Sequence, residues 1–204
     1  MRTQRERMIA GELYTGDQEL RKMNKRNRRI LHMYNATTVD ESAKRVELLK
    51  ELLGKTGEHV YFEPPFRCDY GDHIYLGKNF YANFDCIMLD VAPITIGNNV
   101  MFGPRVGVYT AGHPIDADIR ISGLEFGTPI TIGDNVWVGG DTVINPGVTI
   151  GKNVVIGSGS VVTKDIPDNV VAAGNPCRVL REITAEDTAY WTKLKEEYEQ
   201  EMTD

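Results

Sequence analysis

Apolar and polar residues alternate with a six-residue period through residues 130–166. The segment reads ITIGDN VWVGGD TVINPG VTIGKN VVIGSG SVVTKD I, in which an Ile, Val, Thr or Ser opens each unit and an apolar residue stands two places later. Alternation with a period of two is typical of β-strands, and the Gly, Asp, Asn and Pro residues that follow are typical of turns. Each unit therefore predicts one short strand and one corner. The second apolar position holds Ile132, Val138, Ile144, Ile150, Ile156 and Val162.

The same six-residue pattern continues upstream. Residues 94–108 carry apolar residues in phase with the later units, and residues 74–88 carry a copy displaced by two residues, with the slip near Asp90 to Pro93. Three units close one triangular coil, and coils stacked about 4.8 Å apart pair their backbones as parallel strands around one apolar column. The chain is thus predicted to be a mainly β repeat protein with roughly four to five coils.

The amino-terminal segment, residues 1–58, is charge-rich and has a helical pattern. One helix is predicted over about residues 17–34, with apolar residues on one face and Lys and Arg residues on the other. Thr38 and Glu41 form a capping-box pattern for a further helix, which Gly54 ends. We expect this segment to cover the open first coil of the repeats. The basic helix face is either a solvated surface or a surface that attracts an anionic ligand.

The β-helical segment is predicted to span residues 59–181, and one long insertion interrupts it at residues 112–129. The insertion begins at His113, the single histidine inside the repeats, which stands between a glycine and a proline. Loops of this length in a compact fold are usually functional. Residues 182–204 are predicted to form a carboxy-terminal helix whose aromatic stripe is interpreted as packing rather than as a ligand site. The stripe consists of Tyr190, Trp191, Leu194 and Tyr198.

The composition is that of one domain, with 204 residues of which 41% are hydrophobic. A net charge of -6 argues against nucleic acid or an anionic membrane surface as the main partner. No stretch approaches the roughly 20 apolar residues of a membrane span, and the amino terminus lacks the apolar core of a signal peptide, so we expect a cytoplasmic protein. Cys68, Cys86 and Cys177 lack CxxC spacing, which predicts neither a disulfide framework nor a zinc site.

Further motifs are spread over nearly the whole chain: MIAGELY (8–14), FRCDYG (66–71), NFYANFDCIMLD (79–90), TAGHPID (110–116), ITIGDNVWVGG (130–140), INPGVTIG (144–151) and VVTKDIPDNVVAAGNPCR (161–178). In these motifs the chain closely resembles the maltose and galactoside O-acetyltransferases, and the maltose branch most. The resemblance implies a left-handed parallel β-helix and a homotrimer with active sites between chains. It also implies direct acetyl transfer from acetyl-CoA, in a ternary complex without an acyl-enzyme. The acceptor would be a hydroxyl, such as the primary 6-hydroxyl, of maltose, glucose or a galactoside.

By this resemblance His113 is the general base that takes the proton of the acceptor hydroxyl. A histidine titrates near neutral pH, which suits that role, although a surface histidine beside a turn is the alternative. Tyr81 and Asn83 match positions that line the acceptor site, where an amide can both donate and accept hydrogen bonds. Carboxylates suit sugar hydroxyls as hydrogen-bond acceptors. For Asp90 and Glu125 the alternative is a carboxylate on a solvated corner. The resemblance assigns Asp17, Asp69, Asp90 and Glu125 to acceptor binding.

The resemblance also implies a binding site for CoA near the end of the coil stack. Small residues let the backbone meet the pantetheine arm, and the Gly140 N–H is a candidate donor to the oxyanion of the tetrahedral intermediate. Lysine and arginine side chains can pair with the CoA phosphates, and ordinary surface charge is the alternative. The positions that match the CoA site are Gly140, Ser158, Thr163, Lys164, Arg178 and Arg181.

Three other functions remain open at this point. Hexapeptide repeats alone specify a fold shared by several acyltransferases, so the acceptor could be a compound other than a sugar. A zinc lyase of the same fold needs three histidine ligands, whereas only His73 and His113 fall in or beside the repeats, and no metal is expected. A non-catalytic relative would be expected to have lost His113 or Asn83. His73 matches no catalytic position, and we expect it to be solvated in a loop.

Overall fold

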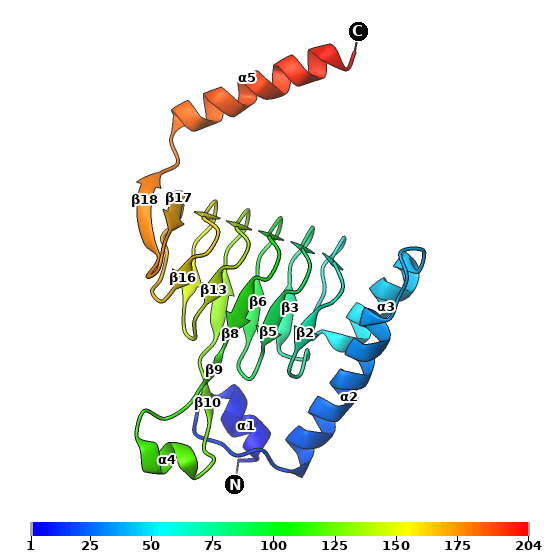
Figure 1. The fold of residues 1–204 in the computed structure, drawn as a ribbon, viewed down its shortest axis with the longest axis vertical. Coiled ribbons are helices and arrows are strands. Elements are labelled where there is room, and N and C mark those ends of the chain that lie inside the picture. Colours follow the sequence, from blue (N-terminus) through cyan, green and yellow to red (C-terminus); the bar gives the residue numbers. More distant parts are fainter. Residues whose placement is uncertain (1, 204) are drawn as a thin grey trace.

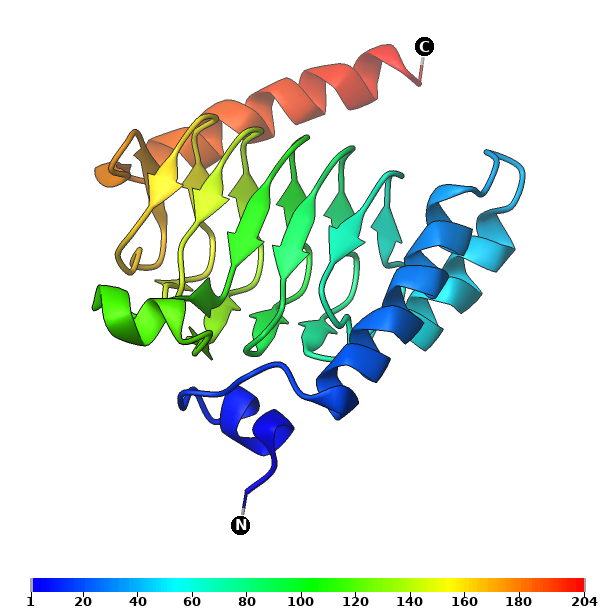
Figure 2. The same cartoon turned by 60° about the horizontal axis from the view of Figure 1, so that its bottom comes forward.

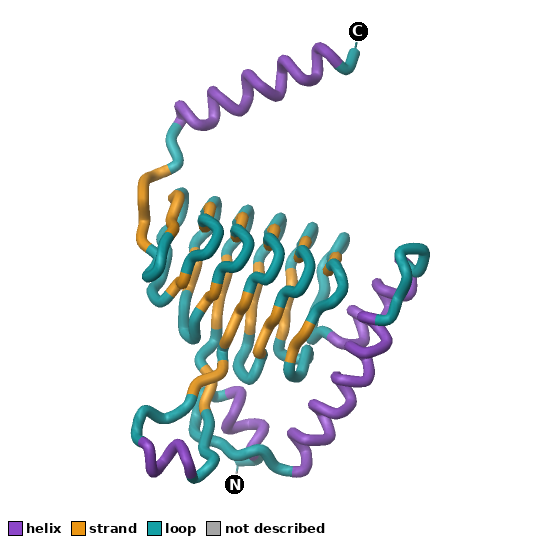
Figure 3. The backbone as a smooth tube through the Cα atoms, viewed as in Figure 1, coloured by secondary structure: helices purple, strands orange, loops and turns teal. Residues whose placement is uncertain are grey.

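The computed structural model describes residues 2–203 as a triangular β-helix with helices at both ends (Figure 1). Figure 3 shows the short strands recurring at the same place in successive coils.

Three parallel sheets form the first, second and third faces, named in the order in which the chain visits them. The first face contains β3 (Ile74–Leu76), β6 (Ile94–Ile96), β11 (Ile130–Ile132) and β14 (Thr149–Ile150). The second face contains β1 (Tyr61–Phe62), β4 (Tyr81–Ala82), β7 (Met101–Phe102), β12 (Trp137–Val138), β15 (Val155–Ile156) and β17 (Val170–Ala173). The third face contains β2 (Arg67–Cys68), β5 (Ile87–Leu89), β8 (Gly107–Tyr109), β13 (Val143–Ile144) and β16 (Val161–Val162).

The predicted inward positions form one continuous apolar core. On the first face Ile94 pairs with both Ile74 and Ile130, so the coils remain in register across the two-residue slip. The sheet of the second face has seven strands, and six of them are parallel because only the last pairing is antiparallel. The mainly β repeat fold is therefore confirmed. The predicted four to five coils were too few, because the first and last turns contribute isolated bridges instead of strands to the first face.

An asparagine ladder holds the corner between the first and second faces. Its members have positive φ angles of 55° to 58°, a conformation that asparagine adopts more readily than other residues with a side chain. Each amide Nδ2 donates to the Oδ1 of the next asparagine at 2.8 to 2.9 Å. The ladder therefore links five successive turns by side chains as well as by backbone. It consists of Asn79, Asn99, Asn135, Asn153 and Asn169.

The three faces differ in the side chains that they turn outward. The first face presents mostly hydroxyl groups, whereas the outer rows of the other two are mostly apolar, and Met101 and Trp137 are 52% and 51% exposed. Exposed apolar surface of this kind is characteristic of a face that contacts another chain. The outer rows are Tyr75, Thr95, Thr131 and Thr149 on the first face; Tyr61, Tyr81, Met101, Trp137, Val155 and Val171 on the second; and Arg67, Ile87, Gly107, Val143 and Val161 on the third.

Three helices precede the coils: α1 (Gln4–Ile9), α2 (Gln18–Asn35) and α3 (Ser42–Leu52). Figures 1 and 2 show α2 and α3 lying across the first coil, and their apolar faces join the core of the coil stack, as the sequence predicts. The buried helix residues of that core include Leu31, Tyr34, Leu49 and Leu52.

The capping box predicted at Thr38 is only half formed. The Glu41 carboxylate accepts the Thr38 N–H at 2.8 Å, but Glu41 is itself the N-cap, and its side chain caps no helical N–H. The prediction was wrong because α3 begins at Ser42, three residues later than the pattern places its start.

Two segments leave the prism. After β8, the insertion forms β9 (Ala111–Gly112), α4 (Ala117–Ile121) and β10 (Phe126–Gly127), and β9 pairs with β10 in antiparallel orientation. At the other end β18 (Arg178–Glu182) turns back along β17, and α5 (Ala185–Glu201) lies apart from the coils and runs back toward the end of the stack where α2 and α3 lie (Figure 1). α5 buries no residue, so the aromatic stripe does not pack within this chain. Within residues 2–203, no helix combines the length and apolar character needed to span a membrane.

Candidate functional site

The corner between the third and first faces carries His113 and Glu125. Gly112 of β9 pairs with Phe126 of β10, so His113 and Glu125 are the next two residues to face each other across these strands. On its other side, Glu125 forms an antiparallel bridge with Tyr14. The Tyr14 hydroxyl also donates to the Glu125 carboxylate at 2.8 Å. The insertion and the amino-terminal segment thus fix Glu125 beside the exposed His113.

Asp90 lies at the same corner, one coil closer to the amino terminus, and is completely buried. Its Oδ1 accepts the N–H groups of Asp69 and Tyr70 at 3.0 and 2.9 Å, and its Oδ2 accepts the N–H of His73 at 3.3 Å. Burial raises the pKa of Asp90 to about 6, opposed by these hydrogen bonds. Both carboxylate oxygens therefore hold the turn at residues 69–73, and the side chain is not exposed as a corner carboxylate would be.

Asp69 and Tyr70 project from that turn into an acidic environment. Burial raises the pKa of Asp69 to about 6, and the charge of Asp90 adds to this effect while Arg28 opposes it. Burial likewise raises the pKa of Tyr70 to about 12, with further contributions from Asp69 and Glu125. Carboxyl groups and phenols crowded in this way can accept and donate hydrogen bonds to several hydroxyls of one ligand.

Asp17 is the N-cap of α2, and its Oδ1 accepts the Leu20 N–H at 2.9 Å. Its charge is among the smaller causes of the raised Tyr70 pKa, after burial and the other three carboxylates, which places it at the edge of the same acidic group. One oxygen of Asp17 is therefore committed to the helix.

His73 contradicts the expectation of a solvated loop residue. It is 2% exposed, its ring lies 5.6 Å from that of Tyr70, and its Nδ1 is 2.7 Å from the backbone oxygen of Asp90. The carbonyl can only accept, so Nδ1 carries the proton. Burial lowers the pKa of His73, which is therefore a neutral supporting residue of the 69–73 turn. No local sequence signal marks its partner, because that partner is a backbone carbonyl in the next coil.

A second group of predicted residues lies at the corner between the second and third faces. Asn83 follows β4, and its Oδ1 accepts the Phe84 N–H at 2.8 Å, while the ring of Tyr81 stacks on that of Tyr61 at 6.2 Å. Gly140 follows β12 at the same corner, two coils further along. A Cβ atom on Gly140 would lie 3.0 Å from the backbone oxygen of Pro104, so glycine is favoured by the close approach of neighbouring coils.

The remaining CoA candidates occupy the far end of the coil stack. Ser158 follows β15 at the corner of Gly140, whereas Thr163 and Lys164 follow β16 at the corner of His113. Arg178 and Arg181 lie on β18. Arg181 already forms two hydrogen bonds with Asp187 of α5, at 2.7 and 2.8 Å, so binding of a phosphate by this arginine would compete with the tie to α5.

One chain thus brings His113 and the predicted carboxylates together, whereas Asn83 and Gly140 lie at another corner. His113, Asp69, Asp90 and Glu125 share one corner, with Asp17 nearby. The third face separates this corner from the corner of Asn83 and Gly140. Within one chain, the proposed base and the proposed oxyanion donor therefore lie on different edges of the prism.

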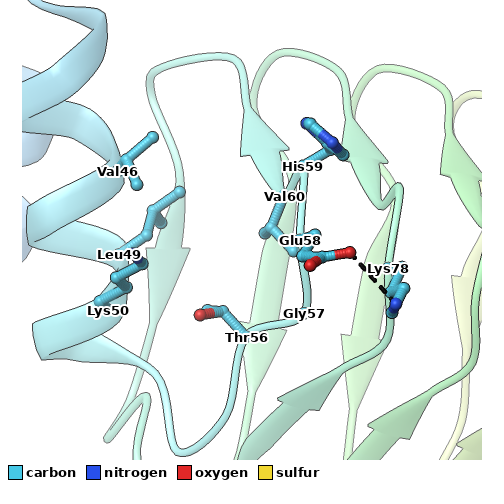
Figure 4. Close-up of a pocket in the computed structure, with 9 residues that line it drawn as sticks. All are labelled: Val46, Leu49, Lys50, Thr56, Gly57, Glu58, His59, Val60 and Lys78. Carbon is cyan, nitrogen blue, oxygen red and sulfur yellow. Dashed lines mark ion pairs between the residues drawn. The ribbon is translucent and has the colours of Figure 1, made fainter.

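Several hollows adjoin the amino-terminal helices, among them two that lie between these helices and the coils. One, of about 600 Å³, lies between α2 and the third face and includes Asp69 together with Arg28, His32 and Arg67 in its wall. The other, of about 670 Å³, lies between α3 and the first coil. Its wall includes Glu58 and Lys78, which form an ion pair of 3.1 Å that is drawn as a dashed line in Figure 4. Only the first contains a residue predicted for the site. Among residues 2–203 no group of three or more His, Cys, Asp or Glu side chains is arranged to hold a metal ion.

The fold and these residues define a hexapeptide-repeat transferase. Residues 129–164 match the family model described as bacterial transferase hexapeptide (six repeats), and residues 7–57 match the maltose acetyltransferase hexapeptide capping motif. The galactoside O-acetyltransferase of Escherichia coli is 48% identical over 189 residues, which cover 92% of this chain and 94% of that protein. The chain belongs to the maltose and galactoside O-acetyltransferase family, and it is an acetyltransferase.

Two solved structures support this assignment. A maltose O-acetyltransferase from Clostridium difficile superposes with a TM-score of 0.89 at 52% identity, covering 90% of this chain and 98% of that one. A galactoside acetyltransferase solved in complex with coenzyme A has the same TM-score at 46% identity, covering 92% of this chain and 94% of that one. The family suggested by the sequence motifs is confirmed.

Proposed function

We propose that this protein transfers an acetyl group from acetyl-CoA to a hydroxyl of a sugar, and that the primary 6-hydroxyl is the acceptor. The observation that carries the proposal is the grouping of His113 with carboxylates at one corner. A sugar offers many hydroxyl donors, and Asp69 and Glu125 supply oxygens that accept their hydrogen bonds. The family membership and the coenzyme A complex of a similar acetyltransferase support acetyl-CoA as the co-substrate.

In the proposed reaction, His113 accepts the proton of the sugar hydroxyl as its oxygen attacks the thioester carbon of acetyl-CoA. A C–O bond forms, and the carbonyl oxygen becomes an oxyanion that the Gly140 N–H stabilises. The C–S bond then breaks, and the proton passes from His113 to the departing CoA sulfur. No acyl-enzyme is needed, because the exposed imidazole serves first as base and then as acid.

Acceptor binding is assigned to Asp17, Asp69 and Glu125, with Tyr81 and Asn83 supplied by a neighbouring chain. Asp90 belongs to this group as a positioning residue, because its two oxygens hold the backbone that presents Asp69 and Tyr70. The pantetheine arm is assigned to the small residues at the second corner and the CoA phosphates to the basic residues near the end of the stack. The CoA residues are Gly140, Ser158, Thr163, Lys164, Arg178 and Arg181.

A homotrimer would join the two halves of the site. The apolar outer rows of the second and third faces support contacts with other copies, and each chain has one corner of each kind to offer. A heterologous contact between two different faces forms a ring where its rotation closes, and three chains form the smallest such ring. Sedimentation of the wild-type protein tests this point directly, because a monomer with full activity would contradict a site shared between chains.

The reaction is tested by following free thiol released from acetyl-CoA in the presence of maltose, glucose, galactosides, chloramphenicol or serine. We expect release that depends on a sugar and disappears in His113→Ala. The exposed His59, changed to asparagine, serves as the matched control and should retain activity. Release with chloramphenicol or serine but with no sugar would refute the proposed acceptor class, and release that survives His113→Ala would refute the proposed base.

A further inference from the structure

α5 carries an apolar stripe that nothing in residues 2–203 covers. Tyr190, Trp191, Tyr198 and Met202 at its end are 59%, 66%, 61% and 71% exposed, and Leu194 lies between them. Their spacing places them on one side of the helix. Most of the stability of a helix in a protein comes from packing its apolar face, so an uncovered stripe of this size indicates a partner.

The charge of α5 narrows the choice of partner. Its sequence, AEDTAYWTKLKEEYEQE, holds six carboxylates and two lysines, so the helix is strongly acidic. Glu197 and Glu201 stand three and seven residues after Leu194, on the same side as the stripe. The complementary surface must combine apolar area with positive charge.

The outer face of α2 has this combination. A groove of about 600 Å³ runs along it, lined by Asn24, Lys25, Arg28, Arg29, His32 and Met33. Met33 is 45% exposed. Within residues 2–203, Lys25, Arg28 and Arg29 form no ion pair with a carboxylate, although other basic residues of the chain do. Arginine and lysine stems provide apolar contact area, and their charged ends attract both carboxylates and aromatic faces.

The direction of α5 favours a second copy over its own α2. Figures 1 and 2 show α5 running back from the β18 end of the stack toward the end where α2 and α3 lie, but to one side of its own prism. Where two chains stand side by side with parallel coil stacks, α5 of one reaches the level of α2 of the other. We propose that α5 of each chain docks its aromatic and acidic side in the α2 groove of a neighbouring copy.

The docking rests on the proposed assembly and is tested by disulfide cross-linking between chains. Tyr198→Cys and Arg29→Cys are placed in two co-expressed full-length forms that carry tags of different size. The native Cys68, Cys86 and Cys177 are buried and compete little. We expect a mixed cross-linked product after mild oxidation only when both substitutions are present. Absence of that product in a protein that sediments as an oligomer, or a monomeric wild-type protein, would overturn the docking.

A charge exchange provides the second test. Glu197→Lys with Glu201→Lys should lower the cross-linked fraction about two- to tenfold. Adding Lys25→Glu with Arg29→Glu should restore the cross-linked fraction. Because Arg29 is itself changed in this test, the neighbouring Met33→Cys serves as the cross-linking site. Failure of the second pair to restore it would refute the proposed pairing. Thiol release is measured in parallel, because none of these residues belongs to the proposed catalytic or CoA site. Normal sugar acetylation without a cross-link would refute the docking alone, whereas cross-linking without acetylation would refute the proposed function alone.

Discussion

Replacement of Asp90 by alanine tests whether a buried carboxylate supports the proposed acceptor site. The structure shows three backbone N–H groups donating to Asp90, two of them at 3.0 Å or less and the third at 3.3 Å. A buried donor left without a partner costs about 1 to 3 kcal/mol. Since the 69–73 turn can relax and the third hydrogen bond is the weakest, we expect Asp90→Ala to lower the free energy of unfolding by about 3 to 5 kcal/mol.

Urea unfolding at a fixed chain concentration measures this loss, because the stability of an oligomer depends on concentration. The matched control is Asp134→Ala, which removes an exposed corner carboxylate that accepts two hydrogen bonds from Asn98. The control should cost about 1 kcal/mol, because the freed groups can bind water.

The same variant also has a kinetic signature. Asp69 and Tyr70 should lose their position in Asp90→Ala, so the KM for the sugar should rise, whereas the KM for acetyl-CoA should remain close to that of the wild type. A stability loss no larger than that of Asp134→Ala, together with an unchanged sugar KM, would refute the idea that Asp90 positions the turn.

Four further predictions concern the reaction and the fold. His113→Ala should lower turnover by about 10² to 10⁴ while leaving CoA affinity, measured by calorimetry, unchanged. Arg178→Ala should raise the KM for acetyl-CoA about tenfold or more, and an effect confined to the sugar KM would contradict its assignment. Burial raises the pKa of Asp69 to about 6, so its carboxylate charge is present above that pH and lost below it. The sugar KM should therefore rise as the pH falls through 6, and Asp69→Asn should weaken this dependence. Asn135→Ala should lower the free energy of unfolding by about 1 to 3 kcal/mol in urea titrations, because it breaks two hydrogen bonds of the ladder and leaves alanine at a φ of 58°.

The repeat fold could be predicted because its signal is local and periodic. The burial of each inward residue, such as Ile132 or Val138, can be predicted from its position in a six-residue unit. The two-residue slip near Asp90 is visible in the sequence as a change of phase. The corner assignment of each site residue follows from the same count. The division of the site between two edges of the prism is therefore implicit in the sequence.

Other features depend on contacts that no period records. Asp90 and His73 are buried in contact with backbone groups of adjacent coils, so neither residue type nor spacing predicts their burial. The bond between Tyr14 and Glu125 joins segments 111 residues apart. The start of α3 was misplaced because Thr38 and Glu41 fit a common pattern in a segment that forms a turn instead. The exposure of α5 could not be foreseen, since an amphipathic helix has the same pattern whichever chain it packs against.

The asparagine ladder separates the part of each coil that must stay constant from the part that can vary. Successive ladder residues are 20, 36, 18 and 16 positions apart in the sequence, yet each pair makes the same contact. The differences in length fall at the corner of His113, where the slip at residues 90–93, the insertion and the shortened turn after β16 all lie. Residues can thus be added to or removed from the corner of His113 without disturbing the alignment of the coils, so loops of different length at that corner are compatible with one and the same coil stack.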